Sequence, residues 1–124
     1  MGTTNANVQD PRYLLAVNFA STASVSSQID LAGYRLAAID MSTAWTAANL
    51  TFAVGSDTVT LQNLYDDAGN EVTVIASSGR NIGLVSSAVA LALESHRWIQ
   101  LRSGTSATPV AQAAARVLNL VAIP

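Results

Sequence analysis

His96 is the sole histidine of this chain and the side chain best suited to proton transfer near neutral pH. A Ser–His–Asp nucleophile system would have to use it, with partners drawn from the many serines and aspartates of the chain. No nucleophile-elbow motif accompanies it, and one histidine does not define a metal site. A small hydrolase would need a polar pocket around His96 with an acid and a nucleophile in reach. We therefore expect His96 to be a strand residue at the surface or at a subunit contact, and we predict no catalytic residue and no enzymatic activity.

The segment from Asp66 to Glu71 gathers carboxylates and an amide, which are oxygen ligands that calcium prefers. Its spacing does not match the EF-hand, which places acidic or amide residues at alternate positions before a glycine. Aspartate, asparagine and glycine are also the residues that hairpin turns select for backbone reasons. The segment thus predicts a hairpin turn in which Asp66, Asp67 and Asn70 are at most candidate cation ligands, and we expect no metal and no cofactor.

Four aromatic residues, Tyr34, Trp45, Tyr65 and Trp98, are candidates for a sugar-binding platform of the kind that some β-sandwiches carry. The chain holds two tryptophans, three tyrosines and two phenylalanines in all, and a sandwich core needs most of them. Core packing is the favoured interpretation, and a carbohydrate-binding β-sandwich module is an alternative. Burial of Trp45 and Trp98 would distinguish the two.

Charged residues make up 11% of the chain, against about 25% in an average soluble domain. The six basic residues are all arginines scattered along the chain, and the net charge is −2. This argues against nucleic acid as a partner, because phosphate binding needs a basic stripe. Interface cores are depleted in charge, so the composition predicts that other protein covers a good part of the surface. A neutral surface rich in serine, threonine and asparagine is the alternative.

The chain has no cysteine, which excludes disulfides, zinc–thiolate sites and thiol catalysis. The N-terminal sequence lacks the charged and apolar regions of a secretory signal. The most apolar run, Ile82 to Leu93, is too short to span a bilayer, so we expect no membrane partner. A length of 124 residues predicts one domain.

Two alternating segments and the corner between them organise the predicted fold. Tyr34 to Met41 and Leu50 to Val54 alternate with the period of a strand, and Trp45 lies in the small, polar corner that joins them. A large ring in that corner can close one end of a core. Further strands are predicted at 12–20, 58–65, 71–76, 81–85, 96–102 and 116–123, a loop or edge strand at 21–27, and a loop with a helical turn at 86–95.

Eight or nine short strands separated by turn residues predict an all-β fold, an antiparallel β-sandwich that is jelly-roll-like. The predicted core contains Ile39, Phe52, Leu61, Val74, Ile99, Leu101 and Leu118. Residues 1–11 form a polar arm without periodicity, which we expect to be extended and to order only against a partner. Residues 12–124 are expected to form the single sandwich domain.

Several motifs resemble, in content and order, those of small proteins encoded among the virion genes of tailed bacteriophages and prophages. The motifs are Tyr34 to Met41, Ala44-Trp45-Thr46, Leu50-Thr51-Phe52, the run from Leu64 to Asn70, and Trp98 to Gly104. The resemblance covers roughly residues 28–124 and is to capsid decoration (cement) proteins and related head auxiliary proteins. It implies a β-sandwich fold and supplies no catalytic motif.

The resemblance implies a virion structural protein that binds the outer surface of a phage head and stabilises it, or else a head or tail fibre component. Its implied partner is the major capsid protein. From the low charge and the arginines we also expect contact with other copies of the chain, with a trimer slightly preferred over a dimer because shells offer threefold positions. The protein would be made in the host cytoplasm and act on the capsid surface. Because arginine suits protein interfaces and the arm lacks a core of its own, we expect interface residues at Asn5, Val8, Arg12, Arg97 and Arg102.

Overall fold

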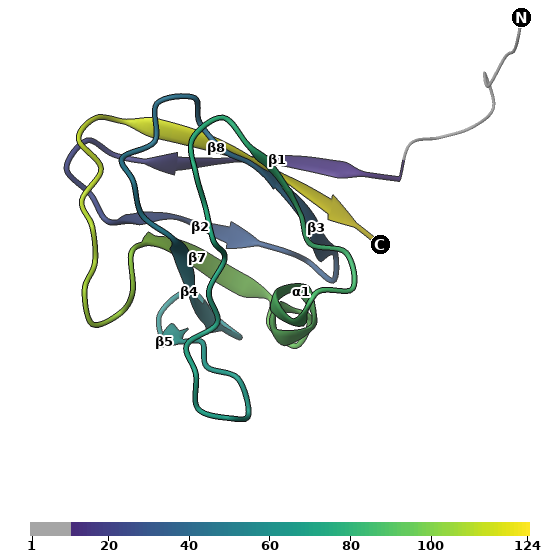
Figure 1. The fold of residues 1–124 in the computed structure, drawn as a ribbon. Coiled ribbons are helices and arrows are strands. Elements are labelled where there is room, and N and C mark those ends of the chain that lie inside the picture. The colour runs from purple at the N-terminus through teal and green to yellow at the C-terminus, as the bar shows by residue number, and fades with distance from the viewer. Residues whose placement is uncertain (1–10) are drawn as a thin grey trace, which may run out of the picture.

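The computed structural model describes residues 11–124, which contain eight antiparallel strands and one short helix joined by turns and loops (Figure 1). In chain order they are β1 (Tyr13–Phe19), β2 (Val25–Asp30), β3 (Arg35–Asp40), β4 (Leu50–Gly55), β5 (Gln62–Asn63), β6 (Asn81–Gly83), α1 (Ala88–Leu93), β7 (Trp98–Ser103) and β8 (Arg116–Ile123). The predicted all-β class is confirmed, and the helical turn falls inside the predicted segment 86–95.

The strands are hydrogen-bonded in the order β5-β4-β7-β2-β1-β8-β3-β6, and every pair is antiparallel. A single residue pair, Phe19 and Ser26, joins β1 to β2, and there the sheet folds over on itself. One layer therefore contains β1, β8, β3 and β6, and the facing layer contains β2, β7, β4 and β5 (Figure 1). This strand order is the jelly-roll arrangement of a β-sandwich, as predicted.

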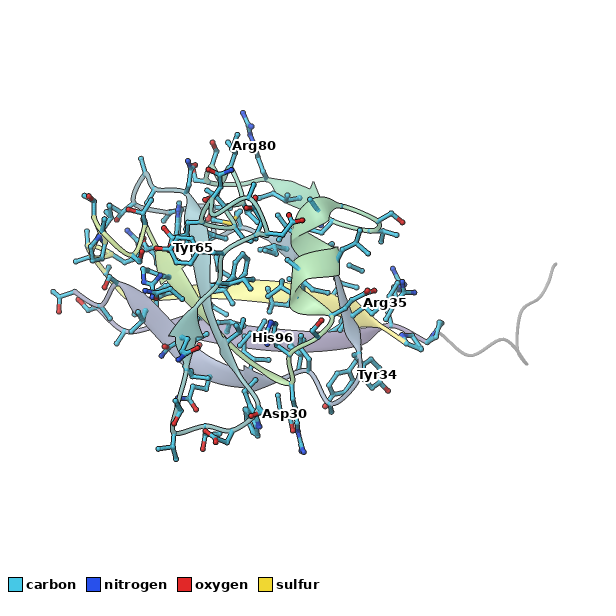
Figure 2. All side chains as sticks on the ribbon, turned by 90° about the horizontal axis from the view of Figure 1, so that it is seen from below. Asp30, Tyr34, Arg35, Tyr65, Arg80 and His96 are labelled. Carbon is cyan, nitrogen blue, oxygen red and sulfur yellow. The ribbon has the colours of Figure 1, made fainter. Side chains whose placement is uncertain are left out.

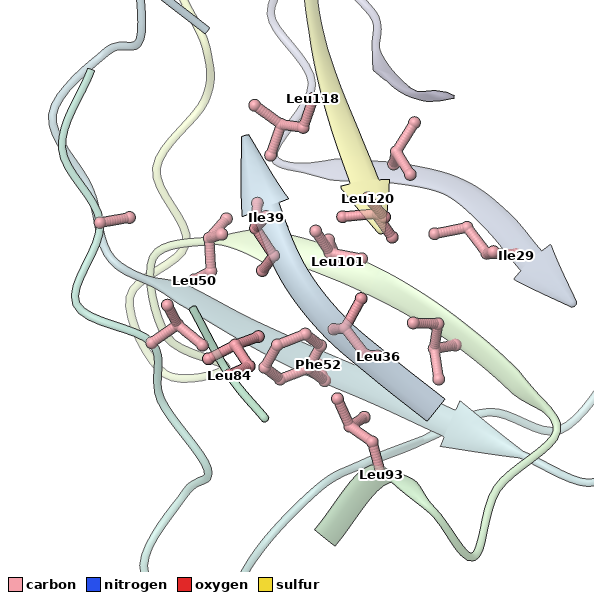
Figure 3. Close-up of a cluster of buried hydrophobic side chains, with 14 of the residues drawn as sticks. Ile29, Leu36, Ile39, Leu50, Phe52, Leu84, Leu93, Leu101, Leu118 and Leu120 are labelled. Atoms are coloured by element: carbon pink, nitrogen blue, oxygen red, sulfur yellow. The ribbon is translucent and has the colours of Figure 1, made fainter. Parts of the chain in front are cut away.

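The core lies between the two layers and takes apolar side chains from both. Phe52 and Leu101 from one layer, and Ile39 and Leu118 from the other, have exposed fractions of 0% (Figure 3). The predicted core is confirmed with one exception, Leu61, which is only half-buried.

The predicted strand at 58–65 is wrong over its first half, because a turn after β4 occupies those residues. The carboxylate of Asp57 accepts hydrogen bonds from the backbone N–H groups of Val59 and Thr60, at 2.9 and 2.8 Å. This local capping competes with strand pairing and holds Leu61 away from the core. The regular strand is thereby reduced to β5.

A β-bulge in β3 changes the alternation predicted for Tyr34 to Met41. The prediction put Leu36 and Ile39 on opposite faces, but the register against β8 shifts between Leu36 and Ala38. The extra residue, Ala37, lets both larger side chains enter the core, and Leu36 and Ile39 are 1% and 0% exposed.

The segment predicted as a strand at 71–76 is not a regular strand. It forms isolated bridges, one between Val74 and Leu50 and one between Glu71 and Tyr65. Its alternate apolar residues still face the core: Val72, Val74 and Ala76. β2 begins inside the segment 21–27, which the sequence assigned to a loop or an edge strand. The other strands end within two residues of their predicted limits.

Trp45 closes one end of the core, as predicted. Its side chain is 7% exposed, and its ring meets Phe19 edge-on with centroids 5.2 Å apart. The indole N–H donates to the carbonyl oxygen of Ala48 at 3.0 Å, so the polar end of the ring is satisfied.

The buried amide of Gln112 ties together three loops at this end of the sandwich. Its Nε2 donates to the carbonyl oxygen of Thr46 at 3.1 Å and to Ser103 Oγ at 2.8 Å, while its Oε1 accepts from Thr46 N at 2.9 Å. The Gln112 backbone N–H donates to the Ala23 carbonyl at 3.0 Å. Because the side chain is 0% exposed and fully bonded, it fixes the loops before β2 and β4 and after β7.

Candidate functional site

Three rows of side chains cross the outer surface of the β1-β8-β3-β6 layer. Residues directly opposite each other in antiparallel strands point to the same side, so the pairing register defines each row. The first row contains Leu14, Val121, Ala38 and Gly83; the second Ala16, Asn119, Asp40 and Asn81; the third Asn18 and Val117. We call these ten residues the β8 face.

The β8 face carries exposed apolar side chains and almost no charge. Leu14 is 71% exposed and Val117 is 49% exposed. Asp40 is the one ionisable residue among the ten, and its carboxylate accepts a hydrogen bond from the amide of Asn81. The face is therefore suited to contact with another neutral surface rather than with a charged one.

The β8 face exists because β1 and β8 carry apolar residues on both sides, with Leu14, Val117 and Val121 pointing outward beside two asparagines. Leu15 and Leu120 lie opposite each other and point inward, while the adjacent pair Leu14 and Val121 points outward. An antiparallel sheet with one solvated face normally alternates apolar and polar residues. Strands that are apolar on both sides are expected where both sides are covered, and within the described residues nothing covers this face.

The outer surface of the other layer is polar and largely bonded within the chain. Arg102 Nη1 lies 3.3 Å from Glu71 Oε2 and donates to Thr51 Oγ1 at 3.3 Å, while Nη2 donates to Asn63 Oδ1 at 2.5 Å. The Glu71 carboxylate also accepts from the backbone N–H of Ser106 at 3.1 Å. The Arg102 side chain is 12% exposed, so its guanidinium holds loops onto this layer.

The other predicted interface residues lie in different places. Arg97 pairs with Asp30 through both carboxylate oxygens, at 2.9 and 3.0 Å, and lies over the ring of Trp98. This hydrogen bond lowers the pKa of Asp30 below its ordinary value and raises that of Arg97. Arg12 is exposed two residues before Leu14, beside the β8 face. The remaining two, Asn5 and Val8, lie outside the described residues.

His96 lies in a shallow groove of about 490 Å³ between Glu94 and Arg97, with Ala32 and Gly33 on the other side. Among the described residues, no hydrogen bond joins its imidazole to a serine or to a carboxylate. The same part of the chain holds no group of three His, Asp or Glu residues placed to bind a metal ion. Figure 2 shows His96 on the same side of the molecule as Asp30 and Tyr34, with Arg80 at the opposite side.

The Asp66 carboxylate is used by its own turn. Its Oδ1 accepts from the backbone N–H groups of Ala68 and Asn70, at 2.9 Å each, and the Asp66 backbone N–H donates to the Asn70 carbonyl. Gly69 has a φ of +86°, which a side chain would oppose. The predicted hairpin turn is confirmed, and these bonds give its aspartate and asparagine a backbone role. Asp67, the third candidate cation ligand, lies in the same exposed turn.

The aromatic residues do not form a flat, open platform. Trp45 is buried, and Trp98 is half-buried with the Arg97 guanidinium 5.6 Å from its ring centroid. Tyr65 is 49% exposed, and its hydroxyl lies 3.3 Å from Ser106 Oγ. These surroundings give a carbohydrate-binding module little support.

The comparisons with known proteins add no relative. No protein-family model, no curated protein and no solved structure matched the chain. No helix in the described part of the chain is long and apolar enough to cross a membrane.

Proposed function

We propose that this chain is a structural protein of a tailed-phage virion, a decoration protein that binds the outer surface of the head through its β8 face. The observation that carries the proposal is the exposed, nearly uncharged surface of the β1-β8-β3-β6 layer. The motif resemblance to capsid decoration proteins supports the same assignment. The low charge of the whole chain agrees with it.

The size of the β8 face indicates how such a protein binds. Two rows across four strands and a third across two strands cover at most roughly 15 by 20 Å, from the ordinary spacings of strands and residues. One partner in a standard interface contributes about 800 Å², so the face supplies the centre of a contact and not all of it. A single copy is then expected to bind weakly. Many copies on one shell, if connected to one another, bind far more tightly than each copy alone.

The β8 face also predicts how the attachment responds to salt. Contacts between neutral, apolar surfaces are not screened, whereas attachment through exposed charges is largely lost at high ionic strength. Because the protein would bind only the assembled shell, bound copies stabilise the shell by mass action.

The test is binding of the purified protein to mature capsids that lack it, measured by co-sedimentation at low salt and at about 0.5 M salt. We expect saturable binding that persists at the higher salt. Absence of binding would contradict the decoration role, and binding that moderate salt abolishes would contradict attachment through the β8 face.

A further inference from the structure

We propose that the groove between β1 and β2 receives residues 1–10 of a second copy of this chain as an added β-strand. The inference concerns contact between copies and does not depend on attachment to a shell.

The groove exists because β1 and β2 separate after one pair. Phe19 and Ser26 are their one point of pairing, and from there the two strands run into different layers (Figure 1). From Tyr13 to Asn18, β1 pairs with β8 along one edge, and no described strand pairs with its other edge. Backbone N–H and C=O groups along that edge are therefore open to another strand.

The groove has the lining that an added strand needs. Its volume is about 550 Å³, and its lining includes apolar Leu15 of β1, apolar Ile29 of β2 and the carboxylate residue Asp30 of β2. The rings of Tyr13 and Tyr34, 5.3 Å apart, stand at one end, and the polar side chain of Gln28 lines the wall from β2. Main-chain hydrogen bonds give such an added strand its affinity, so its own side chains need not be strongly apolar.

The ten residues before Pro11 match this groove in length and place. An extended segment of ten residues spans about 33 Å, and the open edge of β1, six residues, spans about 20 Å. The segment is followed by Pro11, which lies two residues before Tyr13 at the end of the groove. To enter its own groove it would have to reverse direction immediately before β1. The shortest hairpin loops require positive φ, which Pro11 cannot adopt, and a longer loop would use up residues of the ten-residue segment. We therefore commit to a second copy as the donor.

An added strand at the β1 edge lies in the plane of its layer. The second copy then sits beside the molecule and leaves the β8 face open. Such lateral links would connect copies on a surface, which is what the weak contact of one β8 face requires.

The absence of cysteine from the chain allows a clean cross-linking test. Six full-length variants each carry one cysteine at a position from Thr3 to Val8, and each is mixed with the full-length Ala16→Cys variant under mild oxidation. Ala16 is exposed on β1 and lines the groove. The control acceptor is Val59→Cys, an 89% exposed residue that does not line this groove.

Side chains of a strand alternate between its faces, so the yield of cross-linked dimer should rise and fall with a period of two residues along the donor segment. The best donor should react with Ala16→Cys on the order of tenfold faster than with Val59→Cys, because pairing raises the local concentration of the two thiols. Equal rates with both acceptors, or no alternation, would overturn the proposal. A further variant carries the best donor cysteine and Ala16→Cys in the same chain. If it forms an intramolecular disulfide at high dilution, the donor is the same copy, and the proposal is overturned. No shell is present, so these results do not bear on the decoration role.

Discussion

Leu14 on β1 and Val121 on β8 lie directly opposite each other, and both side chains point away from the core. One residue further along the two strands, Leu15 and Leu120 are paired in the same way and point inward. The two central strands of this layer therefore present apolar side chains on both sides. A partner that covers the outer side would remove Leu14, now 71% exposed, from water.

Replacing Phe52 by alanine should lower the free energy of unfolding by about 3–5 kcal/mol, because the 0% exposed ring would leave a cavity between the layers. Urea denaturation followed by circular dichroism measures the change. Leu61→Ala is the matched control, since Leu61 is only half-buried and should cost clearly less. Equal losses for the two variants would contradict the position of Phe52 in the core.

Replacing Ala32 by asparagine should raise the free energy of unfolding by about 1 kcal/mol. Alanine resists the left-handed region of backbone conformation, whereas asparagine tolerates it. Ala32 and Gly33 have φ angles of +49° and +87°, and the Tyr34 N–H donates to the Leu31 carbonyl at 2.8 Å, as in a type I′ turn. Thermal unfolding measures the gain. Ala111→Asn, at an exposed alanine without a positive φ, should give none.

The ion pair between Asp30 and Arg97 should make stability depend on pH in the acid range. The hydrogen bond from Arg97 lowers the pKa of Asp30 in the folded state below its ordinary value of 3.8. A carboxyl with a lowered folded pKa stabilises the protein above its unfolded pKa, and this contribution is lost as the pH falls through the folded pKa. Asp30→Asn should therefore flatten the fall of the melting temperature below about pH 4. Arg97→Ala should flatten this pH dependence similarly. If the melting temperature of both variants falls with pH as steeply as that of the parent, the ion pair does not contribute to stability.

The sequence predicts the regular strands well and the interruptions poorly. β8 matches its predicted range because Leu118, Leu120 and Ala122 alternate with the other residues from Arg116 to Ile123, and the segment contains no glycine or proline. The bulge at Ala37 has no local signal, because it arises from pairing of β3 with a strand far away in the chain. The Asp57 turn has a signal in its Gly-Ser-Asp sequence, but the apolar residues that follow favoured a strand.

The candidate site was missed for a related reason. Leu14, Val117 and Val121 are visible in the sequence as apolar residues of the predicted strands 12–20 and 116–123. What the sequence does not contain is the register that places β1 beside β8 and gathers these residues on one surface. The bonds of Gln112 are hidden in the same way, since they join three loops that are distant in sequence.

The most direct measurement is capsid binding by Leu14→Glu and Val117→Glu, compared with Val59→Glu, a control of the same chemistry at an 89% exposed residue outside the β8 face. All three should keep the circular dichroism spectrum and melting temperature of the parent, because the replaced side chains face solvent in the free protein. We expect the first two to bind more than about tenfold more weakly, since burying an unpaired carboxylate costs well over the free energy of a tenfold change. Val59→Glu should bind like the parent. Equal binding by all three variants would contradict the β8 face as the surface that meets the shell.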